Sequence, residues 1–191
     1  MTSTSPPEDR GGPRGRRPHS GRSHHGALIA AGALLGIGLG GFVDGIVLHQ
    51  ILQWHNMLSS FIEPIDLVAM KTNMLWDGLF HAFTWVMTAV GLALLWRAGQ
   101  RSDVPWSTKI FVGSLALGWG LFNCIEGVID HQIIGLHHVH PGEHQLAWDL
   151  GFLGFGALLV LGGWALIRAG RREGAPARGQ ISYLGTTPPQ P

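Results

Sequence analysis

Two short stretches of the chain place histidines and carboxylates inside otherwise apolar sequence. Residues 44–55 read DGIVLHQILQWH, and residues 126–137 read EGVIDHQIIGLH. Imidazole is a ligand that suits zinc, copper and iron, and a carboxylate adds compensating negative charge. The two stretches therefore predict a transition-metal site for Zn, Cu or Fe.

The two stretches also align with each other without a gap. At the chemically active positions the alignment pairs Asp44 with Glu126, His49 with His131, and His55 with His137. Upstream, Gly36 and Gly38 match Gly118 and Gly120. Histidines and an acid kept at one spacing within apolar sequence indicate an internal duplication.

The hypothesis assigns a role to each candidate residue. We expect the metal ligands to be His49, His81 and His131, with Asp44, Asp77, Glu126 and Asp149 as ligands or as groups that orient the histidines. Asp77 and His81 lie four apart and so share a helix face. The accessory candidates are His55, Asp130, His137, His138, His140 and His144. Of these, we expect His55 and His137 to lie at the membrane interface and not to act as ligands. We expect His138, His140 and His144, which lie in a loop, to be solvated or to deliver ions to the site.

Four apolar segments must position these residues. Each is about 20 residues long, which matches the ~30 Å hydrocarbon core of a bilayer. Charged residues make up only 13% of the chain, and whole segments are apolar on every face, as membrane helices are. The predicted spans are 27–52, 73–96, 109–134 and 145–167. The predicted fold is all-α, an integral membrane four-helix bundle (27–168) made of two tandem helix hairpins, 27–97 and 109–168.

The basic residues are sorted along the chain. Residues 1–26 and 169–191 are rich in proline, glycine and arginine and are predicted to be disordered tails. Together with Arg168 and the loop at 97–109, they hold every Lys and Arg except Lys71. The positive-inside rule then puts both termini in the cytoplasm, in a multi-pass protein of the inner (cytoplasmic) membrane.

Helix geometry places the expected ligands near the outer surface. At ~1.5 Å per residue, His49 and Asp77 lie about 5 and 6 Å below that surface, and Asp44 and His81 both lie about 12 Å deep. A charge at mid-membrane costs at least ~2.5 kcal/mol, so such groups are expected to be paired or metal-bound. Asp44 and His49 diverge by about 140° on an ideal helix, so both reach the interior only by flanking it or if the helix distorts near Gly45.

Other functions fit the same residues. A haem could take His49 and His131 as axial ligands in an electron-transfer protein. A membrane hydrolase could use metal-activated water, and histidines with acids could relay protons in a transporter or form a self-satisfied network. The sequence contains no nucleophile elbow, phosphate-binding glycine loop or HExxH motif. The expected partners are the lipid bilayer and a second copy of the chain or a membrane metalloenzyme; the formal net charge of +1 gives no sign of nucleic-acid binding.

Three strings carry a resemblance to a known family. GGFVDGIVLHQILQWH, NMLWDGLFHA and EGVIDHQIIGLHHV resemble predicted bacterial membrane proteins catalogued as domain of unknown function twenty-two forty-three. The likeness covers about residues 27–168. It implies a four-helix inner-membrane protein and supplies neither an activity nor assigned ligands.

Overall fold

The computed structural model describes residues 25–173 of the 191-residue chain. The predicted tails lie outside these residues, except at 25–26 and 169–173; α1 begins at Gly26, and α4 continues to Glu173. In chain order the elements are α1 (Gly26–Val43), η1 (Asp44–Ile51), α2 (Leu67–Gly99), α3 (Thr108–Glu126), η2 (Gly127–Ile133) and α4 (Gln145–Glu173). The all-α prediction is confirmed.

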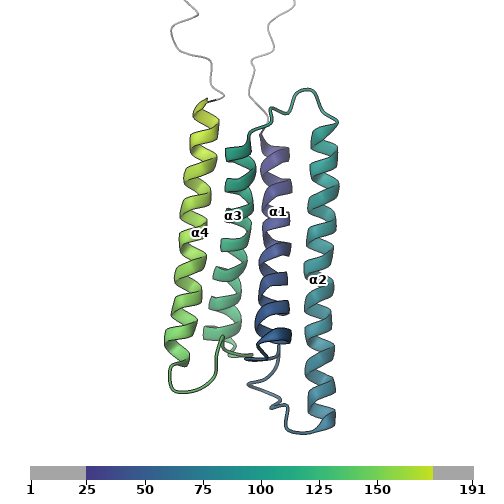
Figure 1. Ribbon diagram of the computed structural model, residues 1–191, viewed down its shortest axis with the longest axis vertical. Helices are drawn as coiled ribbons and strands as arrows, with labels where there is room; N and C mark the ends of the chain where they lie inside the picture. Colours follow the sequence, from purple (N-terminus) through teal and green to yellow (C-terminus); the bar gives the residue numbers. More distant parts are fainter. Residues whose placement is uncertain (1–24, 174–191) are drawn as a thin grey trace, which may run out of the picture.

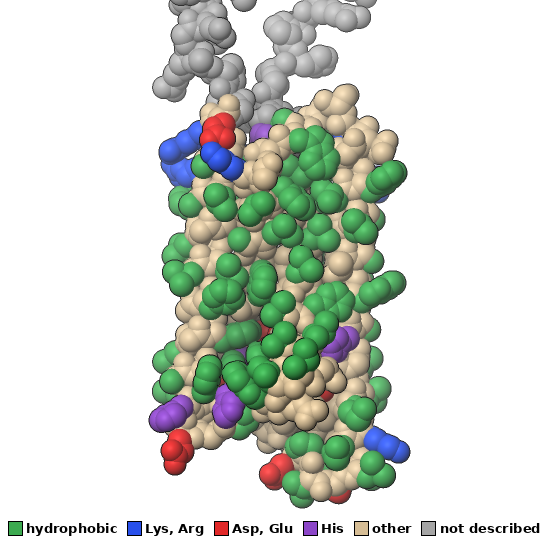
Figure 2. Space-filling view, in the orientation of Figure 1, with side chains coloured by type: hydrophobic (Ala, Val, Ile, Leu, Met, Phe, Trp, Pro, Cys, Tyr) green, Lys and Arg blue, Asp and Glu red, His purple; other side chains and the backbone are tan. Residues whose placement is uncertain are grey.

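Four helical segments are long and apolar enough to cross a membrane. They are Gly26–Ile51, Leu67–Gly99, Thr108–Ile133 and Gln145–Glu173. Apolar side chains cover the middle of the face in Figure 2, and charged side chains gather at its two ends. α2 begins earlier than the sequence predicts because the Asp66 carboxylate caps it by accepting from the Ala69 N–H at 2.8 Å.

The helices lie side by side in the order α2, α1, α3, α4 (Figure 1). α1 packs against α2 and α3, and α3 packs against α1 and α4; no other two of the described α-helices approach each other closely. α2 and α4 are therefore exposed. Only 17% of the residues in the apolar stretch of each are buried inside the protein, whereas the figures for the spans that contain α1 and α3 are 39% and 44%. The four-helix bundle is thus flat and open.

Glycines allow α1 and α3 to pack closely at the centre. A Cβ on Gly36 would collide with the carbonyl of Leu115, and a Cβ on Gly118 would collide with the carbonyl of Ala33. Small residues are the usual means by which membrane helices bring their backbones together. This central contact sets the relative position of η1 and η2, which continue α1 and α3.

Both central helices end in a wider π-helical segment, η1 and η2. In η1 the Leu52 N–H donates to the carbonyl of Val47, and in η2 the Ile134 N–H donates to that of Ile129, each five residues back. This widening brings residues five apart closer to one face than an α-helix does. Of the two arrangements that the sequence leaves open, the structure has the helix distortion near Gly45, and both Asp44 and His49 are buried.

Candidate metal centre

Four buried imidazoles meet where η1, η2 and the two following loops converge. His49 and His131 come from the π-helical segments, and His55 and His137 come from the loops. Ring centroids are 4.3 Å apart for His49 and His55, 4.6 Å for His55 and His137, and 4.8 Å for His131 and His137. Such close packing of four imidazoles leaves little room for solvent between them.

Backbone carbonyls fix the tautomers of His55 and His137. Nδ1 of His55 donates to the carbonyl of Val139 at 2.9 Å, and Nδ1 of His137 donates to that of Met57 at 3.2 Å. A carbonyl only accepts, so the proton sits on Nδ1 and Nε2 of each neutral ring has a free lone pair. Both Nε2 atoms are buried without a hydrogen-bond partner.

Burial also keeps these two rings neutral. It lowers the pKa of His55 to about 4, and that of His137 to about 3, because an imidazolium loses its hydration there; the neighbouring His49 lowers both further. A neutral imidazole with a free Nε2 is the form that binds a metal ion. His55 and His137 therefore have both the protonation state and the tautomer of ligands.

His49 lies between two carboxylates. Its Nδ1 is 3.0 Å from Asp77 Oδ1, and its Nε2 is 3.1 Å from Asp44 Oδ2. The Asp77 contact is a hydrogen bond, whereas Nε2 and Asp44 Oδ2 have no suitably directed partner despite their short separation. When Nδ1 carries the proton, a lone pair on Nε2 faces a carboxylate oxygen, and only a cation or a second proton relieves that repulsion.

The second half of the chain supplies a similar set. His131 Nδ1 lies 3.6 Å from Asp149 Oδ1, and Glu126 Oε1 lies 3.7 Å from His137 Nε2. Glu126 and Asp44 are close enough to interact electrostatically. Neither nitrogen of His131 and neither carboxylate oxygen of Glu126 has a hydrogen-bond partner, although both side chains are buried.

Asp77 and Asp149 hold the loops over the cluster. Asp77 accepts from His49, from the Asn56 amide at 2.7 Å and from the Met57 N–H at 2.8 Å. Asp149 accepts from His138 Nδ1 at 2.7 Å and from the Val139 N–H at 3.0 Å. Both carboxylates are occupied by these donors, an arrangement that suits the second of the two roles expected for them, that of orienting groups.

The contacts recur at matching positions of the two halves. Residues 55 and 137, 56 and 138, and 57 and 139 each lie 82 apart in the sequence. The first pair donates to the carbonyls of the opposite half, and the other two pairs donate to Asp77 and Asp149. Gln50 and Gln132, also 82 apart, lie 3.4 and 3.3 Å from the same two carboxylates.

Two groups of side chains have donor atoms close enough for a shared ion. They are His49, His55 and His137, and Glu126, His131 and His137, with all donor atoms of each group within 4.8 Å of one another. Bonds of ~2.1 Å to one ion place two donors at most ~4.2 Å apart, so small side-chain rotations bring each group into coordination range. The residues present therefore fit a transition-metal ion.

The structure separates the predicted residues into three sets. His49, His131 and Glu126 lie in the two groups, with Asp44 beside His49. His81 lies outside them, with Nδ1 donating to the Asp77 carbonyl at 2.7 Å and its ring against Phe42 and Phe80. The remaining accessory residues also lie outside: Asp130 lines a groove, His138 holds Asp149, His140 packs on Trp54, and His144 is exposed.

His55 and His137 lie deeper inside the protein than the sequence predicts. Both follow the apolar spans, a place typical of the membrane interface, but the loops fold back and bury them. The available signal was the alignment itself, because it keeps a histidine at both positions. The depths of His49 and Asp77, in contrast, were predicted to match, and their 3.0 Å contact confirms it.

Comparison with known proteins identifies the family. The family described as "Predicted membrane protein (DUF2243)" matches residues 31–170, so most of the chain, including all of the histidine cluster, lies within the match. No protein of curated function and no solved structure matches the chain.

Proposed function

The chain belongs to the DUF2243 family of predicted membrane proteins, and we propose that its function is to bind a transition-metal ion in the buried cluster of His49, His55, His131, His137 and Glu126. Asp44, beside Nε2 of His49, adds a further carboxylate. Imidazole-rich sites with carboxylates suit zinc, copper and iron. We assign the protein to metal handling or to delivery of metal to a membrane metalloenzyme.

One observation carries this proposal. Within the described residues, six buried nitrogen and oxygen atoms of this cluster lack a hydrogen-bond partner: Nε2 of His55 and His137, both nitrogens of His131, and both carboxylate oxygens of Glu126. Two more, Nε2 of His49 and Asp44 Oδ2, face each other at 3.1 Å without a suitably directed hydrogen bond. Each such atom costs ~1–3 kcal/mol when it stays unsatisfied. A bound cation satisfies several of them at once.

The same geometry favours an ion over a haem. Nearest imidazole rings of the cluster are 4.3–4.8 Å apart, and His137 packs against both His49 and His131. A haem held by His49 and His131 would need the space that these rings fill. A single ion bound by either group of side chains needs no such space.

The finer assignments belong to the same proposal. The contacts at residues 82 apart support an internal duplication, in which each half supplies one π-helical histidine, one loop histidine and one acid. The excess of Lys and Arg at the end where α1 begins supports cytoplasmic termini in an inner membrane. The metal cluster then lies near the extracytoplasmic side, beneath the two loops.

Equilibrium dialysis tests the proposal directly. Chelator-stripped protein in detergent is dialysed against Zn²⁺, Cu²⁺ or Fe²⁺, and the bound metal is measured by elemental analysis. We expect at least one ion per chain, and about a tenfold or greater loss of affinity in His131→Ala. The exposed His144→Ala serves as the matched control and should bind as the parent does; equal binding by both variants would disprove the assignment.

A further inference from the structure

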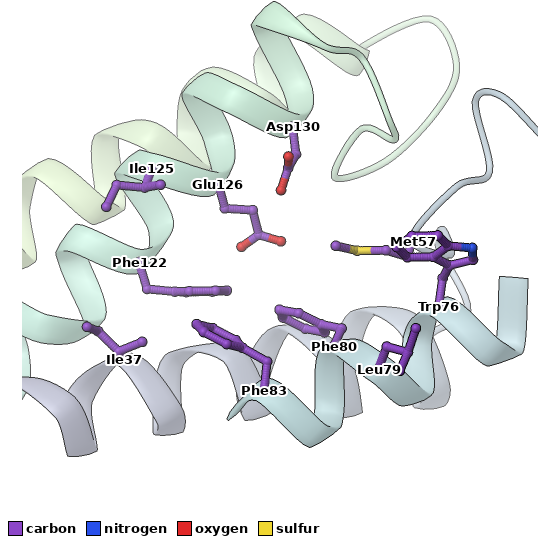
Figure 3. Close-up of a pocket in the computed structure, with 10 residues that line it drawn as sticks. All are labelled: Ile37, Met57, Trp76, Leu79, Phe80, Phe83, Phe122, Ile125, Glu126 and Asp130. Carbon is purple, nitrogen blue, oxygen red and sulfur yellow. The ribbon is translucent and has the colours of Figure 1, made fainter. Parts of the chain in front are cut away.

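A lipid-facing groove lies beside the histidine cluster. It has a volume of about 450 Å³, within the usual range for small-molecule sites. Figure 3 shows its lining residues, which come from α1, α2, α3, η2 and the loop after η1. Because α2 and α3 do not pack against each other, they form the two walls and α1 forms the floor.

Four of the ten residues that line this groove are aromatic. Phe80 and Phe122 are buried and stack with centroids 6.0 Å apart. Trp76 and Phe83 are 45% and 47% exposed and lie at the mouth, which the bilayer would cover. A ligand that enters here from lipid must therefore have an apolar body.

Two carboxyl groups also line this groove, the buried Glu126 and the half-buried Asp130. Glu126 is only 4% exposed, has no hydrogen-bond partner on either oxygen and points into the space between Phe122, Phe80 and Met57 (Figure 3). Asp130 lies one helical turn further on. No Lys or Arg is among the described residues that line the groove.

The acid at position 130 is a feature of this groove alone. The alignment of the two halves, offset by 82 residues, places Leu48 at the equivalent position. Duplication therefore explains Glu126, which matches Asp44, but it does not explain Asp130. The groove therefore has one more carboxyl group than the corresponding part of the first half.

We propose that this groove binds a lipophilic organic cation, of the quaternary ammonium or phosphonium class, with its charge between the aromatic rings and the carboxyls of Glu126 and Asp130. Aromatic faces attract cations by ~0.5–2 kcal/mol, most strongly where water is excluded. Carboxylates supply the countercharge, and the cation relieves the cost of keeping them in apolar surroundings. The inference adds a second site to the metal site, and the two share only Glu126.

Two probes of one shape and opposite charge test the proposal. Equilibrium dialysis of the full chain in detergent measures tetraphenylphosphonium and, separately, tetraphenylborate. We expect saturable binding of the phosphonium and none of the borate. Equal binding of the two probes, or no saturable phosphonium binding, overturns the proposal.

Variants away from the metal ligands locate the site. Asp130→Asn and Phe83→Leu should each weaken phosphonium binding by about fivefold. Their controls are Glu143→Gln, an exposed acid at the same end, and Phe155→Leu, which is 48% exposed on α4; both should bind as the parent does. Unchanged binding in Asp130→Asn and Phe83→Leu would overturn the assignment.

Metal binding and cation binding can be tested independently of each other. The His55→Ala/His137→Ala double variant should lose metal but keep phosphonium binding, measured on the monodisperse fraction from gel filtration. Loss of the phosphonium in this variant would place the probe in the histidine cluster and overturn the groove assignment. Metal binding without phosphonium binding in the parent protein would leave the proposed metal function standing alone.

Discussion

The imidazole rings of His55 and His137 lie parallel, with centroids 4.6 Å apart and planes inclined by 6°. Each ring donates its Nδ1 proton to a backbone carbonyl two residues beyond the other histidine. This reciprocal exchange ties the two loops together over the π-helical segments. It also leaves both Nε2 lone pairs free inside the cluster.

Replacement of the stacked pair should remove the metal. We expect His55→Ala/His137→Ala to lower metal affinity by about a hundredfold or more, because it removes one ligand from one group and two from the other. Competition with a chromophoric chelator measures the affinity. The control is His140→Ala, a loop histidine that packs on Trp54 outside both groups; an equal loss there would show that the effect is not one of coordination.

His81 should be dispensable for metal binding. Its Nδ1 donates to the Asp77 carbonyl, and its ring lies outside both groups of donor atoms. We therefore expect His81→Ala to keep the metal affinity of the parent to within about threefold, whereas His49→Ala loses it. Isothermal titration calorimetry measures the metal affinity of the two variants. A large loss of affinity in His81→Ala would show that His81 is a metal ligand.

The orienting carboxylates should tune the affinity without abolishing it. Asp77 holds Nδ1 of His49 at 3.0 Å and also the backbone N–H of Met57. Removing a residue that orients a ligand costs about 10- to 100-fold in metal affinity. We therefore expect Asp77→Asn to weaken metal binding by about 10- to 100-fold. Asp103→Asn, an exposed acid between α2 and α3, controls for the loss of one negative charge and should change little.

The metal-free protein should lose stability as the pH falls below about 6.5. Burial lowers the pKa of His55 to about 4 and of His137 to about 3, so the folded chain keeps them neutral while the unfolded chain takes up protons below the ordinary pKa of about 6.5. The stabilising contribution is present above that pH and is lost as the pH falls toward 4 and 3. Thermal unfolding in detergent from pH 7.5 to 4.5 should show a falling Tm, with a shallower fall in His55→Asn/His137→Asn. A Tm that rises on acidification would contradict this.

Close packing of α1 and α3 gives a prediction about stability. A side chain at Gly36 would collide with the Leu115 carbonyl, so Gly36→Val should destabilise the protein by about 2 kcal/mol or more. Gly162→Val is the matched control, because a Cβ there has nothing within 4 Å. Unfolding by a denaturing detergent measures both, and similar stability of the two variants would contradict the packing.

The sequence predicts the spans and the depth of the polar layer because apolar length and helical rise depend on local pattern alone. It also predicts that Asp44 and His49 reach the interior only by flanking it or through a helix distortion near Gly45, and η1 provides that distortion. It does not predict the loop contacts of His55 and His137, since these depend on chain reversals after η1 and η2. Nor does it predict that His81 turns back to its own helix, because the Asp77 carbonyl competes with the interior for Nδ1.

The open arrangement of the helices was equally beyond the sequence. Periodicity could not separate a closed bundle from a row because α2 and α4 are apolar on all sides. The order α2, α1, α3, α4 follows from the glycines that let α1 and α3 meet at the centre. This order also produces the groove beside Glu126, which a closed bundle would cover.

The most direct test of the metal site is X-ray absorption spectroscopy on protein purified without chelator, combined with elemental analysis of the same sample. The account predicts at least one Zn, Cu or Fe ion per chain with imidazole-dominated coordination, at metal–nitrogen distances of ~2.0–2.1 Å, and loss of that signal in His55→Ala/His137→Ala. Protein that holds no metal as purified and takes up none from Zn²⁺, Cu²⁺ or Fe²⁺ would contradict it.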